Sequence, residues 1–141
     1  MNEVELKGFA LLADFTEDDC LAIMQVLEQS SLMAGRRLFR EGGQSDGMAL
    51  VVEGTLRLES RRTEQQLRVG AGTALGALAL VGMGPRESTA VSETPCEILW
   101  LRRSEFRRLV DDAPRTACRL LESIAGEFAG RVRRELDSIA S

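Results

Sequence analysis

The spacing of apolar residues changes three times along this chain, and each change marks a different kind of structure. Residues 4–13 are rich in apolar side chains and predict a short N-terminal helix or turn. Behind Thr16, apolar residues recur at helical spacing at Cys20, Ile23, Met24 and Leu27. Thr16 offers a hydroxyl cap, and the acids that follow it suit the positive end of a helix dipole. We therefore predict a helix that begins at Thr16 and ends near Gln29.

Between residues 32 and 101 the pattern becomes that of short strands separated by glycines. Residues 48–52 are all apolar, Gly54 follows them closely, and residues 55–59 alternate between polar and apolar. This order predicts a strand, a turn and a second strand, with Gly54 supplying the positive φ that such a turn needs. Further strands are expected over residues 66–69 and 97–101. Many short strands at regular spacing favour a closed or double-sheet β architecture.

The last part of the chain returns to helical spacing. Ser104 precedes an apolar face and predicts a capped helix that stops before Pro114. A second and longer helix is predicted to begin at Pro114, where the missing N–H costs nothing. The two helices are expected over about residues 104–138. The apolar stripe of the long helix consists of Ala117, Leu121, Ile124, Phe128, Val132, Leu136 and Ile139.

This stripe is longer than one face of a small β domain can cover. Either its first half packs on the β core and the remainder frays, or the stripe pairs with a second copy of the chain. The second interpretation predicts a homodimer through residues 114–139, in which Gly126 and Gly130 permit close approach of the helices. No internal repeat is visible, and we expect residues 1–141 to form one domain.

Composition and charge narrow the possible functions. With 44% hydrophobic and 28% charged residues among 141, the chain has a globular composition. A formal net charge of −4 and a pI near 5.0 argue against direct nucleic-acid binding, so the arginine pairs at 61–62 and 102–103 are interpreted as solvated surface. No apolar run approaches the ~20 residues that cross a bilayer, so no membrane partner is expected.

Few side chains in this sequence are suited to catalysis or metal binding. The absence of histidine removes the commonest general base and the commonest metal ligand. The three cysteines are far apart, fit no metal-site spacing and follow no signal peptide, which predicts reduced thiols in a cytoplasmic protein. Adjacent acids at 18–19 and 111–112 would point to different faces of a helix. We therefore expect no enzyme activity, no metal and no resident cofactor.

The most informative segment lies near the middle of the chain. Residues 75–80 read Leu-Gly-Ala-Leu-Ala-Leu, and residues 85–90 read Pro-Arg-Glu-Ser-Thr-Ala. A loop of small residues thus stands beside one arginine, Arg86. Exposed backbone N–H groups and a guanidinium at short range are how proteins hold a single phosphate group. The sequence therefore predicts an anion site formed by this loop and Arg86.

This segment resembles the phosphate-binding cassette of cyclic-nucleotide-binding domains, which reads roughly Phe-Gly-Glu-Leu-Ala-Leu and then Arg-Ala-Ala-Thr. Residues 34–42 are similar to the family's opening Gly-x-x-Leu/Ile-Phe-x-x-Gly strand, and residues 48–54 to its Tyr-Ile-Val-x-x-Gly strand and turn. The resemblance covers residues 12–136. It implies a mainly β fold with flanking helices, a double-stranded β-helix or jelly roll (β-roll) with an N-terminal helix and two C-terminal helices.

The resemblance also implies which residues would meet a cyclic nucleotide. Arg86 would pair with the phosphate, and the ligand-binding set is Gly76, Ala77, Leu78, Arg86, Glu87, Ser88 and Thr89. The long C-terminal helix would cover the ligand, with Arg119, Glu122 and Ser123 as base contacts. The ligand implied is cyclic AMP (cAMP), cyclic GMP (cGMP) or a related phosphate compound.

Two positions depart from the family pattern. Ala77 stands where the family has a glutamate that accepts a hydrogen bond from the ribose, a contact worth roughly 1.5–3 kcal/mol. Glu87 adds a carboxylate beside Arg86, where it would repel a phosphate or occupy the arginine. Both changes argue against tight binding of a cyclic nucleotide. Arg86 could instead be a surface partner of Glu87 or Glu93.

Two functions therefore stay open. Domains of this family occur in transcription regulators of the catabolite-activator type, in cyclic-nucleotide-dependent kinases and in gated channels, and this chain resembles a free-standing sensor module. It could be a regulatory sensor that binds cAMP, cGMP or a related phosphate ligand and signals through its C-terminal helix. It could also be a degenerate dimerisation or protein-interaction module, in which Leu75, Leu78 and Leu80 fill the pocket or another small ligand binds.

Overall fold

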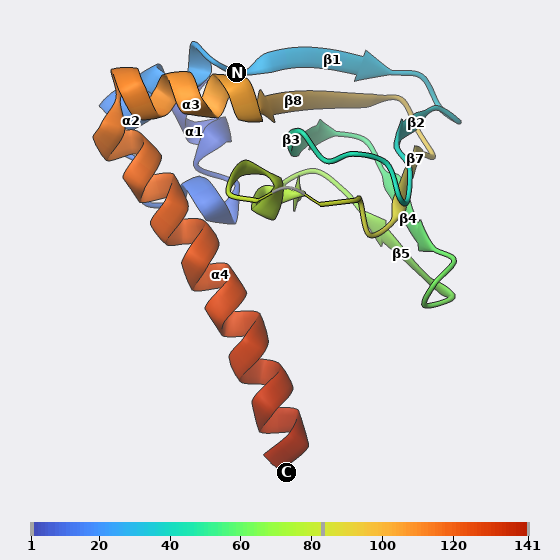
Figure 1. Cartoon of the computed structure of the whole chain (residues 1–141). Helices are drawn as coiled ribbons and strands as arrows, with labels where there is room; N and C mark the ends of the chain where they lie inside the picture. The colour runs from blue at the N-terminus through green and yellow to red at the C-terminus, as the bar shows by residue number, and fades with distance from the viewer. Residues whose placement is uncertain (1, 83, 141) are drawn as a thin grey trace.

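The computed structural model describes residues 2–82 and 84–140, which form two antiparallel β-sheets with helices at one end (Figure 1). One sheet has the strand order β1-β8-β3-β6 and the other β2-β7-β4-β5. The strands are β1 (Glu28–Leu32), β2 (Arg37–Phe39), β3 (Gly47–Glu53), β4 (Leu56–Ser60), β5 (Gln65–Val69), β6 (Ala74–Leu75), β7 (Thr89–Ser92) and β8 (Cys96–Arg102). The helices are α1 (Glu3–Leu6), α2 (Glu17–Met24), α3 (Arg103–Asp112) and α4 (Pro114–Ala140), with 3₁₀ turns η1 (Ala10–Leu12) and η2 (Ala77–Leu80).

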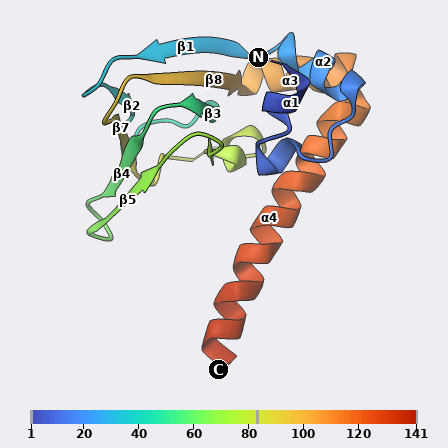
Figure 2. The same cartoon turned by 180° about the vertical axis from the view of Figure 1, so that it is seen from behind.

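This architecture confirms the predicted mainly β fold with an N-terminal helix and two C-terminal helices. In Figures 1 and 2 the helices α1, α2 and α3 gather at one end of the β1-β8 pair, and the β4-β5 hairpin lies at the opposite end. The predicted N-terminal helix or turn over residues 4–13 appears as α1 and η1. Residues 1, 83 and 141 of the single domain predicted over residues 1–141 lie outside the described residues, and that domain boundary stays a prediction.

Strand β3 separates two hydrophobic cores, which explains why its sequence is continuously apolar. Met48 and Leu50 face a core formed with the N-terminal helices, α3 and the first half of α4. Ala49 and Val51 face the core between the two sheets, which also contains Trp100. Because successive side chains of a strand point to opposite faces, a strand buried on both sides shows no polar alternation. The predicted turn after β3 is confirmed, since Gly54 has a φ of 96°.

The helix predicted from Thr16 to Gln29 is correct at its start and wrong at its end. Thr16 and Asp19 form a capping box at the N-terminus of α2, but the helix ends at Met24. Strand β1 begins at Glu28 and pairs with β8 over five residues, from Glu28 opposite Trp100 to Leu32 opposite Cys96. The backbone hydrogen bonds of this pairing override the local helical spacing, and the chain turns between Met24 and Glu28.

The predicted cap at Ser104 is also wrong. Strand β8 continues directly into α3, so Arg102 occupies the N-cap position, without a side-chain hydrogen bond. Arg102 is still in register with Gly47 of β3, and the backbone N–H of Arg103 donates to the Asp46 carbonyl at 2.7 Å. Sheet pairing therefore sets the start of this helix. Its end before Pro114, and the start of α4 at Pro114, are confirmed.

Helix α4 has two unlike halves. In its first half Ala117, Leu120 and Ile124 are buried against the domain. In its second half the predicted apolar stripe is exposed at Phe128, Val132, Leu136 and Ile139, and the helix extends away from the sheets (Figures 1 and 2). Packing of the first half is confirmed, but the expected fraying of the remainder is wrong, because the helix continues to Ala140. Pairing of the second half with another copy stays a prediction. Among the described residues, no helix has the length and apolar content needed to cross a membrane.

Candidate functional site

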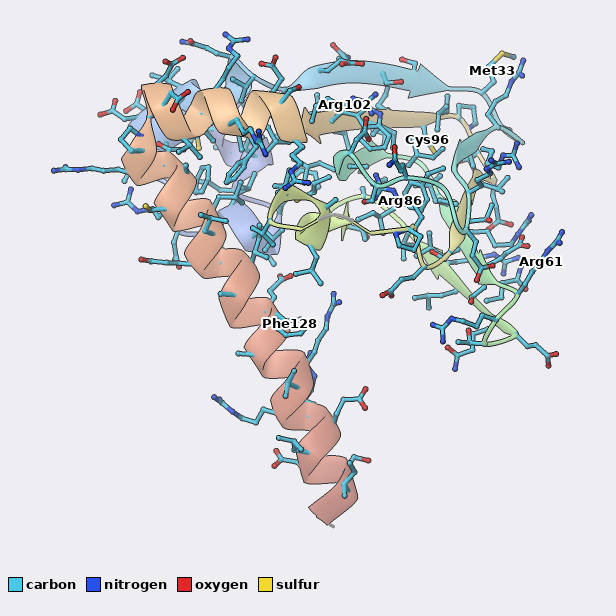
Figure 3. All side chains as sticks on the ribbon, in the orientation of Figure 1. Met33, Arg61, Arg86, Cys96, Arg102 and Phe128 are labelled. Atoms are coloured by element: carbon cyan, nitrogen blue, oxygen red, sulfur yellow. The ribbon has the colours of Figure 1, made fainter. Side chains whose placement is uncertain are left out.

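A cavity of about 490 Å³ lies between the second sheet, the loop from β6 to β7, and α4. Figure 3 shows Arg86 on the sheet side and Phe128 on α4. The cavity is lined by Phe39, Ser45, Leu58, Ala74, Leu75, Gly76, Ala77, Leu78, Ala79, Gly82, Gly84, Pro85, Arg86, Glu87, Ser88, Ile124, Glu127, Phe128 and Arg131. It thus combines the predicted loop with one face of the long helix. Its size suits a small organic ligand, for which pockets of roughly 300–1,000 Å³ are usual.

The loop wall of the cavity depends on Gly76. This residue precedes η2 and has a φ of 78°, a conformation that residues with a side chain rarely adopt. A Cβ atom at this position would lie 2.2 Å from Nη1 of Arg86 and 3.3 Å from the carbonyl oxygen of Gly47. Only a glycine therefore allows the loop backbone to lie directly against the guanidinium.

Arg86 is buried in this wall with 6% of its surface exposed. Its Nη2 donates to the carbonyl oxygen of Gly47 at 2.9 Å, and its Cζ lies 4.4 Å from the centre of the Phe39 ring and 5.9 Å from that of Trp100. Its own backbone is held as well, because its N–H donates to the Gly43 carbonyl at 2.7 Å. The position of the guanidinium is thus set by the Phe39 ring, the Gly47 carbonyl and Gly76.

The charge of Arg86 has no acidic partner within the described residues, where the arginine makes no ion pair. Its buried Nε atom also has no hydrogen-bond partner among them. Burial lowers the pKa of Arg86 below its ordinary value; nearby Asp46 raises it and Arg102 lowers it further. Arginine remains charged in proteins, and a buried charge is costly unless it is compensated. An anionic ligand in the cavity would supply that compensation.

The proposed alternative in which Arg86 forms a surface ion pair is wrong. Arg86 is buried, and Glu93 is engaged elsewhere, with Arg68 at 2.6 Å and Arg57 at 3.8 Å. Glu87 lines the cavity and is exposed, and no hydrogen bond or ion pair joins it to Arg86 within residues 2–82 and 84–140. The carboxylate of Glu87 therefore leaves the guanidinium of Arg86 available to a ligand.

Most of the predicted site residues do meet at the cavity. Gly76, Ala77, Leu78, Arg86, Glu87 and Ser88 all line it. Thr89 is the exception, because it begins β7 and its hydroxyl accepts a hydrogen bond from the backbone N–H of Glu41 at 2.9 Å. The leucines also do not fill the cavity: Leu75 and Leu78 line it but leave about 490 Å³ open, and Leu80 packs into the core formed with the helices. That part of the degenerate-domain interpretation is wrong.

The helix residues at the cavity differ from those predicted. Arg119, Glu122 and Ser123 are absent from the lining, and Arg119 forms an ion pair with Asp19 instead. The residues that do line the cavity from α4 are Ile124, Glu127, Phe128 and Arg131. The packing of α3 and α4 determines which turn of α4 borders the cavity. The sequence therefore gives only a weak signal for the helix residues that line it. That signal is Phe128, an aromatic residue on the part of the stripe that the domain does not bury.

The chemistry of the cavity is that of binding. Forked donors come from Arg86 and Arg131, acceptors from Glu87 and Glu127, and apolar walls from Leu58, Ile124 and Phe128. No group of three residues that could hold a metal ion occurs within the described part of the chain. A guanidinium, a loop of small residues and apolar walls together suit a ligand with one phosphate and one flat apolar part.

Known proteins resemble this chain in sequence. The family model for the cyclic nucleotide-binding domain matches residues 29–113. The cGMP-dependent protein kinase isozyme 1 of Drosophila melanogaster is 30% identical over 129 residues, which are 86% of this chain and 16% of that protein. The cAMP-dependent protein kinase regulatory subunit of Eremothecium gossypii is 32% identical over 95 residues, 66% of this chain and 20% of that protein. The chain thus spans 20% or less of these two relatives.

A solved structure extends the likeness to the flanking helices. The N-terminal domain of a transcriptional regulator from Streptomyces coelicolor A3(2) has a TM-score of 0.80 and 24% identity, and the match covers 96% of this chain and 94% of that one. This match shows a shared fold over nearly the whole chain. Because the family model matches more than half of the sequence, the chain belongs to the cyclic nucleotide-binding domain family.

Proposed function

We propose that this member of the cyclic nucleotide-binding domain family is a regulatory sensor, which binds cAMP, cGMP or a related phosphate ligand in the cavity and signals through α4. The phosphate would pair with Arg86 and the N–H groups that follow Gly76. The base would lie against Leu58, Ile124 and Phe128. No chemical step is involved, and the domain would be a non-catalytic, cytoplasmic module.

One observation carries this proposal: Arg86 is a buried cation that forms no ion pair with the acids of residues 2–82 and 84–140, and it lies in the wall of a cavity large enough for a nucleotide. A structural arginine would normally be paired with a carboxylate or exposed to water. Here the guanidinium lies directly against the loop backbone at Gly76, and both line the cavity. The relatives named for cAMP and cGMP support the choice of ligand class.

Helix α4 would report binding because it belongs to both the cavity and the exposed stripe. Ile124 and Phe128 line the cavity, and Val132, Leu136 and Ile139 continue the same helix into solvent. A ligand that prefers one position of α4 would shift the population toward that position. A second copy of the chain, paired along residues 114–139, would sense this shift.

The test is isothermal titration of the purified protein with cAMP and with cGMP, beside two variants. Arg86→Ala removes the guanidinium from the cavity, and Arg107→Ala removes an exposed arginine of α3 that lies outside it. We expect binding in the wild type and in Arg107→Ala, and none in Arg86→Ala. Circular dichroism of each variant checks that the fold is retained. An absence of heat with both nucleotides in the wild type would contradict the proposal.

The alternative of a dimerisation or protein-interaction module that binds no cyclic nucleotide is favoured by Ala77. This residue is partly buried at the cavity and offers no carboxylate to a ribose. In that case the exposed stripe of α4 would be the functional surface. Sedimentation with and without nucleotide separates the two functions, because dimerisation of this module would be unaffected by nucleotide, whereas dimerisation of the sensor would change.

A further inference from the structure

Asp19 joins the two ends of the chain in a buried polar cluster. Asp19 is 4% exposed and lies in the first turn of α2. Thr116 donates to its Oδ1 at 2.5 Å, and Arg119 donates to its Oδ2. Both partners belong to the first two turns of α4, about 100 residues later in the chain. The cluster therefore fixes the beginning of α4 to the N-terminal helices.

Helix capping accounts for only part of this arrangement. The capping box needs the bond from the Thr16 backbone N–H, which reaches Oδ2 at 2.9 Å, and the bond from the Asp19 backbone N–H to the Thr16 hydroxyl. The bonds to Thr116 and Arg119 are additional. Burial raises the pKa of Asp19, but hydrogen bonds from Thr116, Thr16 and Arg119 outweigh it and lower the pKa from 3.8 to about 2. The carboxylate is thus a charged acceptor that α4 itself satisfies.

The position of this cluster along α4 determines what it can influence. The helix is buried at Ala117, Leu120 and Ile124, and most residues beyond Ile124 are exposed. The cavity wall begins at Ile124 and continues to Arg131. From Arg119 to Phe128 the helix rises by about 14 Å at 1.5 Å per residue, so a tilt of about 10° at the anchored end would move Phe128 by about 2 Å. Small changes at Asp19 would therefore change the shape of the cavity.

We propose that Asp19 is a positioning residue for the ligand site: by holding Thr116 and Arg119 it sets the tilt of α4, and with it the distance between the Phe128 wall and Arg86. This inference rests on the proposed function insofar as it concerns a ligand. Asp19 itself is not among the residues that line the cavity. Its effect on binding would be transmitted entirely through α4.

The first test compares two ion pairs. Arg119→Met removes the charged partner of Asp19 on α4 and leaves the capping box intact. Arg108→Met is the matched control, because Arg108 pairs with Glu105 within α3 at 2.7 Å and touches neither α4 nor the cavity lining through that pair. We expect Arg119→Met to weaken binding of the preferred nucleotide, cAMP or cGMP, about threefold to tenfold, and Arg108→Met to leave it unchanged. Equal affinities in the two variants would overturn the proposal.

A double-mutant cycle separates positioning from general loss of stability. In a Phe128→Ala background the wall contact is already gone, so Arg119→Met should have little further effect on affinity. A merely structural role for Asp19 would lower affinity, if at all, by the same factor in both backgrounds. Additive effects would therefore refute the positioning role.

A distance measurement without ligand keeps the proposal independent of the proposed function. Spin labels at Thr63→Cys in the β4-β5 turn and Glu135→Cys on α4, in a Cys118→Ser background, report the tilt of the helix; Cys20 and Cys96 are buried. Labelled protein is mixed with excess unlabelled protein, so that only distances within one chain count. We expect Arg119→Met to shift or broaden the distance distribution and Arg108→Met to leave it unchanged. An unchanged distribution in Arg119→Met overturns the positioning role, whereas a shift without any nucleotide binding supports it and refutes only the sensor function.

Discussion

The two walls of the cavity are held in opposite ways. On the sheet side, Arg86 is fixed by its own backbone bonds, by the Gly47 carbonyl and by the Phe39 ring. On the helix side, α4 is tied down only up to Ile124, and Phe128 beyond it is 51% exposed. A fixed wall suits recognition of an anion, because donors that are already in place lose little entropy on binding. A wall held at one end suits a conformational response to a ligand, because the free part of α4 can take more than one position at a small cost in free energy.

The largest effect is expected from a change that disrupts the fixed wall. Gly76→Ala would strain a positive φ and push a methyl group to within 2.2 Å of Nη1 of Arg86. We expect a loss of stability of about 1–3 kcal/mol in thermal unfolding, and nucleotide binding weakened beyond about a hundredfold in isothermal titration.

Gly35→Ala is the matched control for that experiment. Gly35 has a φ of 81°, close to the 78° of Gly76, but no atom lies within 4 Å of its added Cβ. It should therefore show the backbone strain and retain nucleotide binding. If both alanine variants bind equally well, the close approach of Gly76 to Arg86 is unimportant for the ligand.

A second change should strengthen nucleotide binding at the fixed wall of the cavity. Replacing Ala77 by glutamate and Glu87 by alanine restores the acceptor that the family pattern implies and removes the extra carboxylate from the cavity rim. We expect the affinity for cAMP or cGMP to rise about tenfold to a hundredfold, as a charged acceptor is worth roughly 1.5–3 kcal/mol. Titration of the double variant measures this rise. If neither nucleotide binds even then, the cavity does not serve these ligands, and the interaction-module function gains support.

Low pH should weaken the attachment of α4, the helix wall of the cavity, because it protonates Asp19. The pKa of this carboxyl is lowered from 3.8 to about 2 in the folded protein, so its contribution to stability is fully present above pH 4 and is lost as the pH falls toward 2. The shift corresponds to about 2 kcal/mol. Urea unfolding at pH 5 and pH 2.5 measures the loss, and Asp19→Asn is the reference because it cannot titrate. We expect a smaller drop between the two pH values in Asp19→Asn, and equal drops would show that other carboxyl groups dominate.

The smallest effect on the domain itself is expected at the free end of α4. Leu136→Glu with Ile139→Glu places charges on the exposed stripe, so thermal unfolding of the domain should change by less than about 0.5 kcal/mol. The predicted homodimer should nevertheless dissociate, which sedimentation equilibrium measures. Val4→Glu is the control, since Val4 is as exposed as Ile139, each at 81%, but lies in α1. A dimer that survives the double change does not use this stripe.

Several elements could be predicted because their causes lie within a few residues. The apolar run of β3, the glycine turn at Gly54 and the cap at Thr16 each follow from local spacing and backbone geometry. Proline fixes its own φ, so the start of α4 at Pro114 was predictable as well. Part of the candidate site could also be predicted from the sequence, since Gly76 and Arg86 belong to one short segment.

Other features were out of reach of the sequence because they depend on residues far apart. Helix α2 ends early and β1 begins at Glu28 because β8, about 70 residues later, offers it a pairing edge. Arg86 is buried because β2 and β8 bring Phe39 and Trp100 around it. From the sequence alone, a surface ion pair of Arg86 therefore stayed open as an alternative.

The sequence by itself determined the class of fold and the glycine loop beside Arg86, because hydrophobic spacing, glycine positions and one arginine express themselves locally. Only the tertiary structure decided which face of α4 meets the cavity and what holds that helix in place. Helical periodicity defines a stripe but not its contact partner, and Thr116 and Asp19 are 97 positions apart. The tilt of α4 is therefore a property of packing between distant segments, and the packing selected Ile124 and Phe128 as its cavity wall.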